Sequence, residues 1–366
     1  MQNTKDIKIT ECNSMKNNDE NYYWGLDLIR ILAMFFVILV HSTSFYGYIG
    51  CDISSFPIFL AGVGRYLSYT CIPLFLILTG YLNSNKTPTL RYYFKILKIL
   101  IEFVLCGIVV FLVNRFCFDN TTSILTFARK LFAFQYPSYS WYINMFVGLF
   151  LLTPFLNSLY KSLSNNTKLI LIISLVLIFS LPNVTSYWTI AYPIMYYFIG
   201  LFLKDKQFKI KNYILLLCII LICVLQTLIS QTNLKIYTPE NHYNLGCLIL
   251  SISIFLLFYN LKTPQSSTRK IKIIKPLRII ANASLSTFLI SQIFETLTST
   301  FFSKLAITTF SEKLPYLAYL TPIKFILSVI CGLVISFLAS QLYKLTIRLT
   351  DKIIEKRKNK AKKNSN

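Results

Sequence analysis

The sequence predicts an all-α membrane protein that crosses the bilayer about ten times, with both chain ends in the cytoplasm. Of its 366 residues, 55% are hydrophobic and only 14% are charged, whereas a soluble domain has about a quarter charged residues. The mean hydropathy is +0.57, and apolar runs long enough to cross a bilayer recur along the chain. This composition excludes an ordinary soluble enzyme, and it also excludes a disordered chain.

The first five apolar runs are bounded by charged or turn residues, which is how candidate spans are recognised. The run 25–47 follows a polar tail and contains ionisable residues, so it is not a cleaved signal peptide. The runs 56–82, 97–115 and 141–160 have enough residues to span the ~30 Å hydrocarbon core. The run 168–182 is shorter and ends at a Leu-Pro-Asn sequence.

Five further runs follow in the second half of the chain. The run 188–203 is also short, whereas the runs 213–231, 244–261, 279–302 and 317–345 are separated by polar connections rich in Lys, Asn or Thr. No connection is long enough for a separate soluble domain. We therefore expect a polar cytoplasmic tail, a single transmembrane domain and a basic cytoplasmic tail, which occupy residues 1–21, 22–345 and 346–366.

The distribution of Lys and Arg predicts the orientation, because cytoplasmic connections carry the excess of positive charge. Of the 37 basic residues, 28 fall in the two tails and in every second connection, and only 6 fall in the other connections. This split indicates an even number of spans and cytoplasmic termini in the cell membrane. Since the basic residues lie between apolar runs, the formal charge of +23 does not predict nucleic-acid binding. Basic residues spaced by four at 344–356 predict contact with anionic membrane lipids.

The first span contains three ionisable side chains, Asp27, Arg30 and His41. A central Arg or Asp costs ~2.5–3.5 kcal/mol in a membrane helix, and pairing of Asp27 with Arg30 three residues later lowers that cost. Arg30 and His41 are eleven residues apart, so on a helix they share one face and are separated by ~16 Å along the axis. With the N-terminus inside, Arg30 lies toward the cytoplasm and His41 toward the outside.

This geometry suggests two roles on one helix face. A permanent guanidinium near the inner surface suits a phosphate-bearing donor, and a histidine deeper in the membrane suits proton transfer. The alternative is purely structural: Arg30 extends to lipid headgroups and His41 hydrogen-bonds a neighbouring helix. At this point both interpretations stay open.

The pattern Leu26-Asp27-x-x-Arg30-x-x-Ala33 with His41 resembles the signature of acyltransferase family 3, a family of integral membrane proteins. Other segments resemble family motifs in the same order: 72–82 (IPLFLILTGYL), 93–100 (YFKILKIL), 141–142 (WY), 148–156 (GLFLLTPFL) and 196–200 (YYFIG). The resemblance extends over residues 22–345.

Transfer of an acyl group across the membrane is the activity that the resemblance implies. A cytoplasmic acyl-CoA, usually acetyl-CoA, donates the acyl group to a hydroxyl of an extracytoplasmic or lipid-linked glycan. Arg30, Lys95 and Lys98 would lie near the donor phosphates, although positive-inside anchoring explains the two lysines equally well. His41 would act as general base or as acyl carrier. Neither a metal nor a resident cofactor is expected, and a separate extracytoplasmic transferase is a possible partner.

The sequence departs from the family pattern at two places. The family often has a histidine shortly before the Trp of the fourth span and another at the end of a YLIH motif, whereas this chain has Ser138-Tyr139-Ser140 and Ser291. His41 is then the only histidine in a predicted span, since His242 lies in an outer loop, 232–243. We expect these changes to alter the acceptor pocket.

Further charged and aromatic residues are candidates for the site. Glu295 in the ninth span would orient His41 or balance an arginine, and Trp141 would stack on a sugar acceptor or belong to the interfacial aromatic belt. The other intramembrane charges are Arg65, Glu102 and Lys324, and such residues are rare enough in membranes to suggest function.

Two other functions compete with the acyltransferase hypothesis. A transporter or flippase for a polar metabolite or a lipid-linked sugar would use the same charged groove without acyl chemistry. A purely structural membrane protein explains poorly why an Arg/His face lies inside the bilayer.

Overall fold

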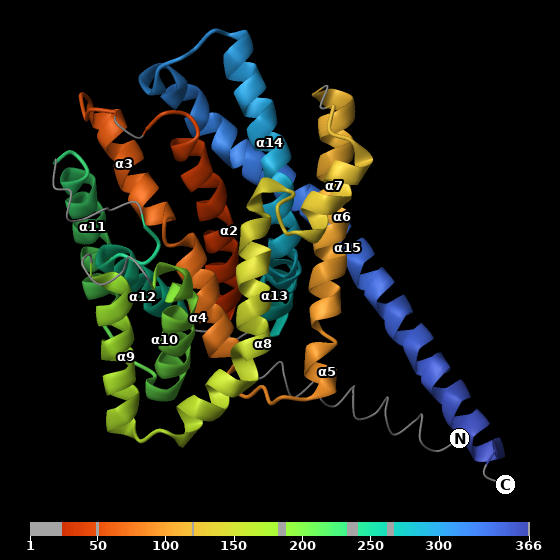
Figure 1. Ribbon diagram of the computed structural model, residues 1–366. Coiled ribbons are helices and arrows are strands. Elements are labelled where there is room, and N and C mark those ends of the chain that lie inside the picture. The colour runs from red at the N-terminus through yellow and green to blue at the C-terminus, as the bar shows by residue number, and fades with distance from the viewer. Residues whose placement is uncertain are drawn as a thin grey trace.

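The computed structural model describes residues 24–48, 51–118, 121–181, 188–232, 241–261 and 267–364, so the predicted tail 1–21 lies outside the described residues. The described chain is helical and contains no strand, which confirms the predicted fold class (Figure 1). The helices are α2 (Trp24–Ser44), α3 (Phe56–Ser68), α4 (Cys71–Asn83), α5 (Leu90–Tyr93), α6 (Ile96–Cys117), α7 (Ile124–Phe132), η1 (Ser138–Ser140), α8 (Trp141–Ser162), α9 (Asn165–Ser180), η3 (Thr189–Ala191), α10 (Tyr192–Lys206), α11 (Asn212–Ile229), α12 (Leu245–Tyr259), α13 (Ser267–Asn282), α14 (Ser284–Lys304) and α15 (Phe310–Asn364).

Six helical segments in the described residues are long and apolar enough to cross a membrane, and a seventh is formed if α13 and α14, which meet at 64°, make one broken span. The other three predicted spans coincide with α9, α10 and α12, which have 16, 15 and 15 residues. At 1.5 Å per residue these helices measure about 24 Å or less. The protein is thus a multi-pass membrane protein, while the count of ten spans and the cytoplasmic termini remain predictions.

Three predicted spans differ from the observed helices in their details. The span 56–82 is divided into α3 and α4, which meet at Tyr69 and Thr70. The span 279–302 begins at the α13–α14 bend. The last span continues as one helix to Asn364, and the end of α15 projects away from the helix bundle in Figure 1.

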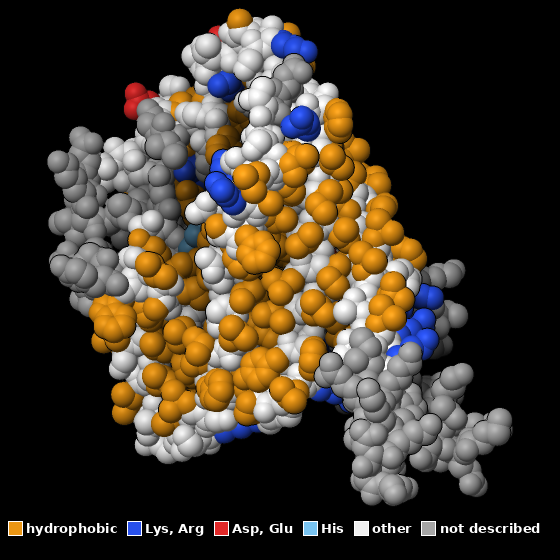
Figure 2. Space-filling model, turned by 45° about the vertical axis from the view of Figure 1, so that its right-hand side comes forward, with side chains coloured by type: hydrophobic (Ala, Val, Ile, Leu, Met, Phe, Trp, Pro, Cys, Tyr) orange, Lys and Arg blue, Asp and Glu red, His pale blue; other side chains and the backbone are white. Residues whose placement is uncertain are grey.

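The outer surface of the bundle has the character expected of a membrane protein. In Figure 2 a broad field of hydrophobic side chains covers the middle of the molecule, and Lys and Arg gather above it and below it. Large apolar side chains such as Ile170, Leu217, Ile220 and Phe337 are more than half exposed. Exposed apolar area on this scale is unfavourable in water but suits a lipid-facing belt.

Helix α2 lies at the centre of the fold. It packs against α3, α4, α12, α13, α14 and α15, and its residues Ile29, Ala33 and Met34 are completely buried. Because so many helices surround α2, the ionisable side chains that it carries project into protein rather than lipid. This arrangement positions the candidate site.

Helices α4 and α10 approach each other closely at their backbones. A Cβ atom at Gly80 would lie 2.1 Å from the carbonyl oxygen of Tyr197, and one at Gly200 would lie 2.2 Å from the carbonyl oxygen of Ile77. Small residues at such crossings let backbones approach where lipid provides no hydrophobic drive for helix association.

Replacing Gly200 with alanine is expected to lower the free energy of unfolding by about 1–3 kcal/mol, because the added methyl group forces the two backbones apart. Thermal unfolding of the detergent-solubilised protein measures the effect. Gly148→Ala is the matched control, since a Cβ there meets no atom within 4 Å. Equal unfolding temperatures for the two variants would contradict close α4–α10 packing.

Candidate active site

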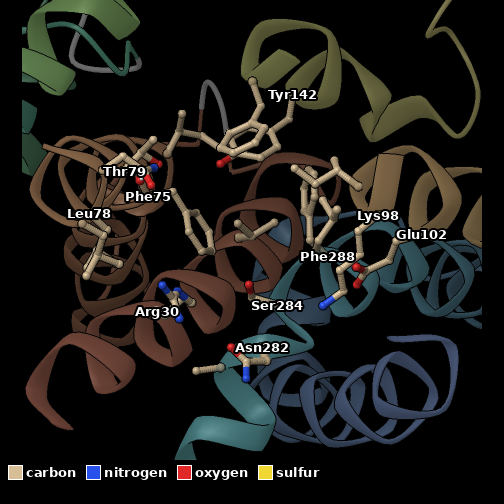
Figure 3. Close-up of a pocket in the computed structure, with 18 residues that line it drawn as sticks. Arg30, Phe75, Leu78, Thr79, Lys98, Glu102, Tyr142, Asn282, Ser284 and Phe288 are labelled. Carbon is tan, nitrogen blue, oxygen red and sulfur yellow. Dashed lines mark hydrogen bonds between the residues drawn. The ribbon is translucent and has the colours of Figure 1, made fainter. Parts of the chain in front are cut away.

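A cavity of about 400 Å³ lies between α2, α4, α6, α8 and the bend that joins α13 to α14. Its wall is mainly apolar, with polar groups at particular places: Arg30, Thr79, Asn83, Lys98, Glu102, Tyr142, Asn282 and Ser284. Figure 3 shows Arg30 on one side of the cavity and Lys98 with Glu102 on another, with Ser284 between them. An apolar chamber with a few convergent polar groups is typical of a small-molecule site.

The predicted pairing of Asp27 with Arg30 is confirmed, because Arg30 Nη1 lies 3.2 Å from Asp27 Oδ1. The Arg30 side chain remains 24% exposed and lines the cavity. Arg278 from α13 lies within electrostatic range of Asp27. In the sequence Arg278 directly precedes the predicted span 279–302, among the basic residues of a connection. Two guanidinium groups thus act electrostatically on the Asp27 carboxylate.

The two predicted donor-binding lysines occupy different places. Lys98 lines the cavity, whereas Lys95 is exposed at the start of α6 and is not among the cavity residues. Glu102 lies one turn beyond Lys98 and is buried. Its carboxylate accepts a hydrogen bond from the hydroxyl of Ser286 on α14. The cavity therefore contains a buried carboxylate that the sequence marked only as an intramembrane charge.

His41 lies near the C-terminal end of α2, where its ring is stacked between two aromatic rings. The Tyr139 ring is 4.4 Å away at an angle of 12°, and the Phe45 ring is 5.2 Å away at 14°. Because 3.6 residues make one turn, Arg30, Val37 and His41 lie on one face of α2. Arg30 and Val37 line the cavity, but His41 does not.

Two aromatic rings separate the cavity from His41. The Phe288 ring lines the cavity and stacks on Tyr139 at 5.4 Å, and Tyr139 stacks in turn on His41. The sequence predicts a donor path from Arg30 to His41. In the structure this path ends at Val37, one turn or about 6 Å short of the histidine. Both rings come from elements far from α2 in the sequence, which is why periodicity on α2 alone could not reveal them.

The C-terminal end of α2 is held by a buried ion pair. Lys324 Nζ on α15 lies 2.9 Å from Glu295 Oε1 on α14 and donates to Ser42 Oγ at 2.6 Å. The hydroxyl of Tyr46 donates to Glu295 Oε2 at 2.9 Å. The ion-pair partner of Glu295 is thus a lysine rather than an arginine, and the pair holds the residue that follows His41. A role of Glu295 in orienting His41 remains a prediction.

A second cation supports the same end of α2 from α3. Arg65 is completely buried, and its guanidinium donates to Ser44 Oγ at 2.8 Å and to the Tyr69 hydroxyl at 3.0 Å. Charged groups on three neighbouring helices, α3, α14 and α15, thus hold the residues that follow His41. Held from both sides, this end of α2 has little freedom to rotate.

Trp141 does not reach the cavity. Its side chain is 44% exposed and meets the Tyr142 ring edge-on at 6.4 Å. In contrast, Tyr142 lines the cavity, and Tyr139 covers His41. The aromatic residues of this segment that face the site are therefore the tyrosines, and a role of Trp141 at an acceptor sugar remains a prediction.

His242 is drawn into the helix bundle although the sequence places it in an outer loop. Its Nδ1 lies 2.8 Å from the carbonyl oxygen of Tyr69, and its ring packs against Tyr69 and Tyr192. His242 and His41 lie within electrostatic range of each other. The sequence gives no signal for this position, because the loop 232–243 carries neither a motif nor a helical periodicity.

The described residues offer no arrangement for a metal ion. No three side chains of His, Cys, Asp or Glu come together in the described ranges. The eight described cysteines are free thiols, and four of them are buried.

Comparison with known proteins gives one family match. A family model described as an acyltransferase domain, that of acyltransferase family 3, matches residues 23–342. No curated protein and no solved structure matches the chain. The matched segment contains every helix that contributes to the cavity and to the surroundings of His41.

Proposed function

The chain belongs to acyltransferase family 3, and we propose that it transfers an acetyl group from cytoplasmic acetyl-CoA to a hydroxyl of an extracytoplasmic or lipid-linked glycan. Membership in the family makes the protein a membrane acyltransferase; the donor, the acceptor and the direction of transfer are our proposals. These proposals rest on one face of α2. Arg30 and Val37 on that face line the cavity, and His41 lies on the same face one helical turn after Val37.

The cavity suits the acyl end of a thioester whose phosphates remain at the entrance. Arg30 and Lys98 provide two positive charges on the wall, and a guanidinium binds phosphate oxygens through paired N–H groups. The mainly apolar remainder of the wall matches an uncharged pantetheine arm. The volume of about 400 Å³ falls within the range of small-molecule sites.

His41 provides the base for the transfer step. A neutral imidazole nitrogen accepts the proton of the acceptor hydroxyl while the oxygen attacks the thioester carbonyl carbon. The bond from carbonyl carbon to sulfur then breaks, and the leaving thiolate takes the proton back from the imidazolium, which regenerates the neutral base. The stacked rings of Tyr139 and Phe45 hold the imidazole plane, which fixes the direction of its nitrogens.

Contact between donor and His41 requires the rings of Phe288 and Tyr139 to rotate. Both rings stand between the cavity and the imidazole. We infer that these rings close the path between the cavity and the imidazole and move aside only when donor and acceptor are both bound. Such a closure also keeps water from the thioester, which limits hydrolysis before an acceptor arrives. If His41 instead carries the acyl group itself, a separate extracytoplasmic transferase would receive the group from it.

Substitutions at Lys98 and Lys95 test the donor site. Lys98→Gln removes a charge from the cavity wall, and we expect the KM for acetyl-CoA to rise about tenfold to a hundredfold, since a charged hydrogen bond contributes about 1.5–3 kcal/mol. Lys95→Gln is the matched control, because Lys95 lies three residues away on the same helix and outside the cavity; its KM should stay within twofold. Equal effects of both variants would contradict the assignment.

The same purified protein distinguishes acyl transfer from transport. With labelled acetyl-CoA in detergent, an acyltransferase releases free CoA and labels an added glycan acceptor. A flippase or transporter moves its solute in vesicles without consuming the thioester, and that result would overturn the proposed function.

A further inference from the structure

A second pocket, of about 250 Å³, lies between the connection after α4 and the helices α8, α9 and α10. It is separate from the proposed acyl-CoA cavity and shares none of its lining residues. Three lysines line it: Lys161, Lys168 and Lys204. They belong to the connections that the charge distribution assigns to the cytoplasm.

The charges in this pocket do not cancel. Its one carboxylate, Asp205, pairs with Lys168, whose Nζ lies 2.9 Å from Asp205 Oδ2. Lys161 contacts only the side-chain oxygen of Asn85, at 3.5 Å. Lys204 is half-buried, and its Nζ lies 5.4 Å from the centre of the Tyr81 ring. Two ammonium groups therefore lack a carboxylate partner in the pocket.

Burial and neighbouring like charges both disfavour the charged form of Lys204. Burial lowers the pKa of its ammonium group below the ordinary value, and the neighbouring charges of Lys86 and Lys161 lower it further. Lys204 lies beyond the predicted span 188–203, at the end of α10. An anion between these lysines would remove the repulsion.

A hydroxyl group without a partner also lines the pocket. Ser84 Oγ is buried and makes no hydrogen bond, although buried polar atoms are nearly always satisfied. Ser84 and its neighbour Asn85 are both lining residues. A hydroxyl and an amide can donate to an oxygen-rich ligand in the same small space.

We propose that this second pocket binds a phosphate group, held by Lys161 and Lys204 and by the hydroxyl of Ser84. Phosphate oxygens accept several hydrogen bonds, and their negative charge would pair with the two ammonium groups that have no carboxylate partner. The group can come from an anionic phospholipid of the same leaflet or from the nucleotide end of a soluble cofactor such as CoA. The second source is plausible because Asn83 lines the first cavity and Ser84 the second. The phosphate site does not depend on the acyltransferase proposal.

Two other lysines of the same connection fit positive-inside anchoring alone and serve for comparison. Lys206 and Lys209 follow Lys204 closely and are exposed, and neither lines the pocket. They provide a matched control with the same loss of charge.

Binding to the full-length, delipidated protein in neutral detergent tests the proposal. Native mass spectrometry measures the binding of phosphatidylglycerol against phosphatidylcholine, and calorimetry measures that of CoA against pantetheine, which lacks the nucleotide phosphates. The variants are Lys161→Gln/Lys204→Gln, Ser84→Ala and the control Lys206→Gln/Lys209→Gln.

We expect the pocket variant to weaken binding of one phosphate ligand at least tenfold, Ser84→Ala to weaken it severalfold, and the control to stay within twofold. Loss in the phosphatidylglycerol arm assigns the pocket to lipid, and loss in the CoA arm assigns it to the nucleotide. Unchanged binding of both ligands by both pocket variants would overturn the proposal. Ser84→Ala keeps the test valid if the double variant unfolds, because it removes a single oxygen atom.

Discussion

Replacing His41 with alanine is expected to lower the rate of acyl transfer by about 10²–10⁴-fold, the contribution of a well-placed general base. The affinity for acetyl-CoA should stay the same, because His41 does not line the donor cavity. A loss in kcat without a change in KM is therefore the expected result. Release of free CoA in the presence of acceptor, followed with purified protein, measures both constants.

Phe45→Ala is the matched control for His41→Ala. It removes one of the rings stacked on the imidazole and leaves the nitrogens in place, so the expected loss is several-fold only. His242→Ala reports on the second histidine, which lies within electrostatic range of His41. Full activity of His41→Ala together with loss in His242→Ala would transfer the role of base to His242 and contradict the assignment made above.

Removing one partner of the Lys324–Glu295 pair is expected to lower the free energy of unfolding by about 3–5 kcal/mol, because the remaining charge stays buried without compensation. The side chains of Lys324 and Glu295 are only 4% and 8% exposed. Lys324→Met and Glu295→Gln should each unfold at markedly lower temperature than the unmodified protein. The double variant should cost less than the sum of the two, since no isolated charge remains.

The pair of Lys168 and Asp205 provides a control of similar geometry. Its atoms are also 2.9 Å apart, but the Asp205 side chain is 39% exposed, and an exposed pair contributes about 0–1 kcal/mol. Asp205→Asn should therefore leave the unfolding temperature nearly unchanged. Additive effects of Lys324→Met and Glu295→Gln would contradict a direct interaction between the two buried side chains.

The helical fold and the α2 face could be predicted because both depend on local sequence. Apolar runs of sufficient length predict helices, and the interval of eleven residues between Arg30 and His41 places both on one face of any straight helix. The pairing of Asp27 with Arg30 follows from the same geometry and is confirmed. The family match over residues 23–342 agrees with the motifs recognised along the chain.

The contacts between distant segments could not be predicted in the same way. Glu102 meets Ser286 across 184 positions, and no periodicity within either helix determines which faces are opposed. The partner of Glu295 was expected to be an arginine or His41, yet helix packing brings Lys324 to it instead. Lys95 and Lys98 were assigned alike because sequence gives their spacing but not the position of the cavity wall.

Transfer across the membrane is the central claim, and vesicles of known orientation test it most directly. The purified protein is reconstituted into sealed liposomes, and protease digestion of the basic C-terminal tail determines which way it is oriented. Labelled acetyl-CoA is then supplied on one side of the membrane and a membrane-impermeant glycan acceptor on the other. We expect label on the acceptor only when the donor is on the side of the basic tail, and no label with His41→Ala. Equal labelling with the donor on either side, or labelling that persists in His41→Ala, would contradict transfer through the α2 face.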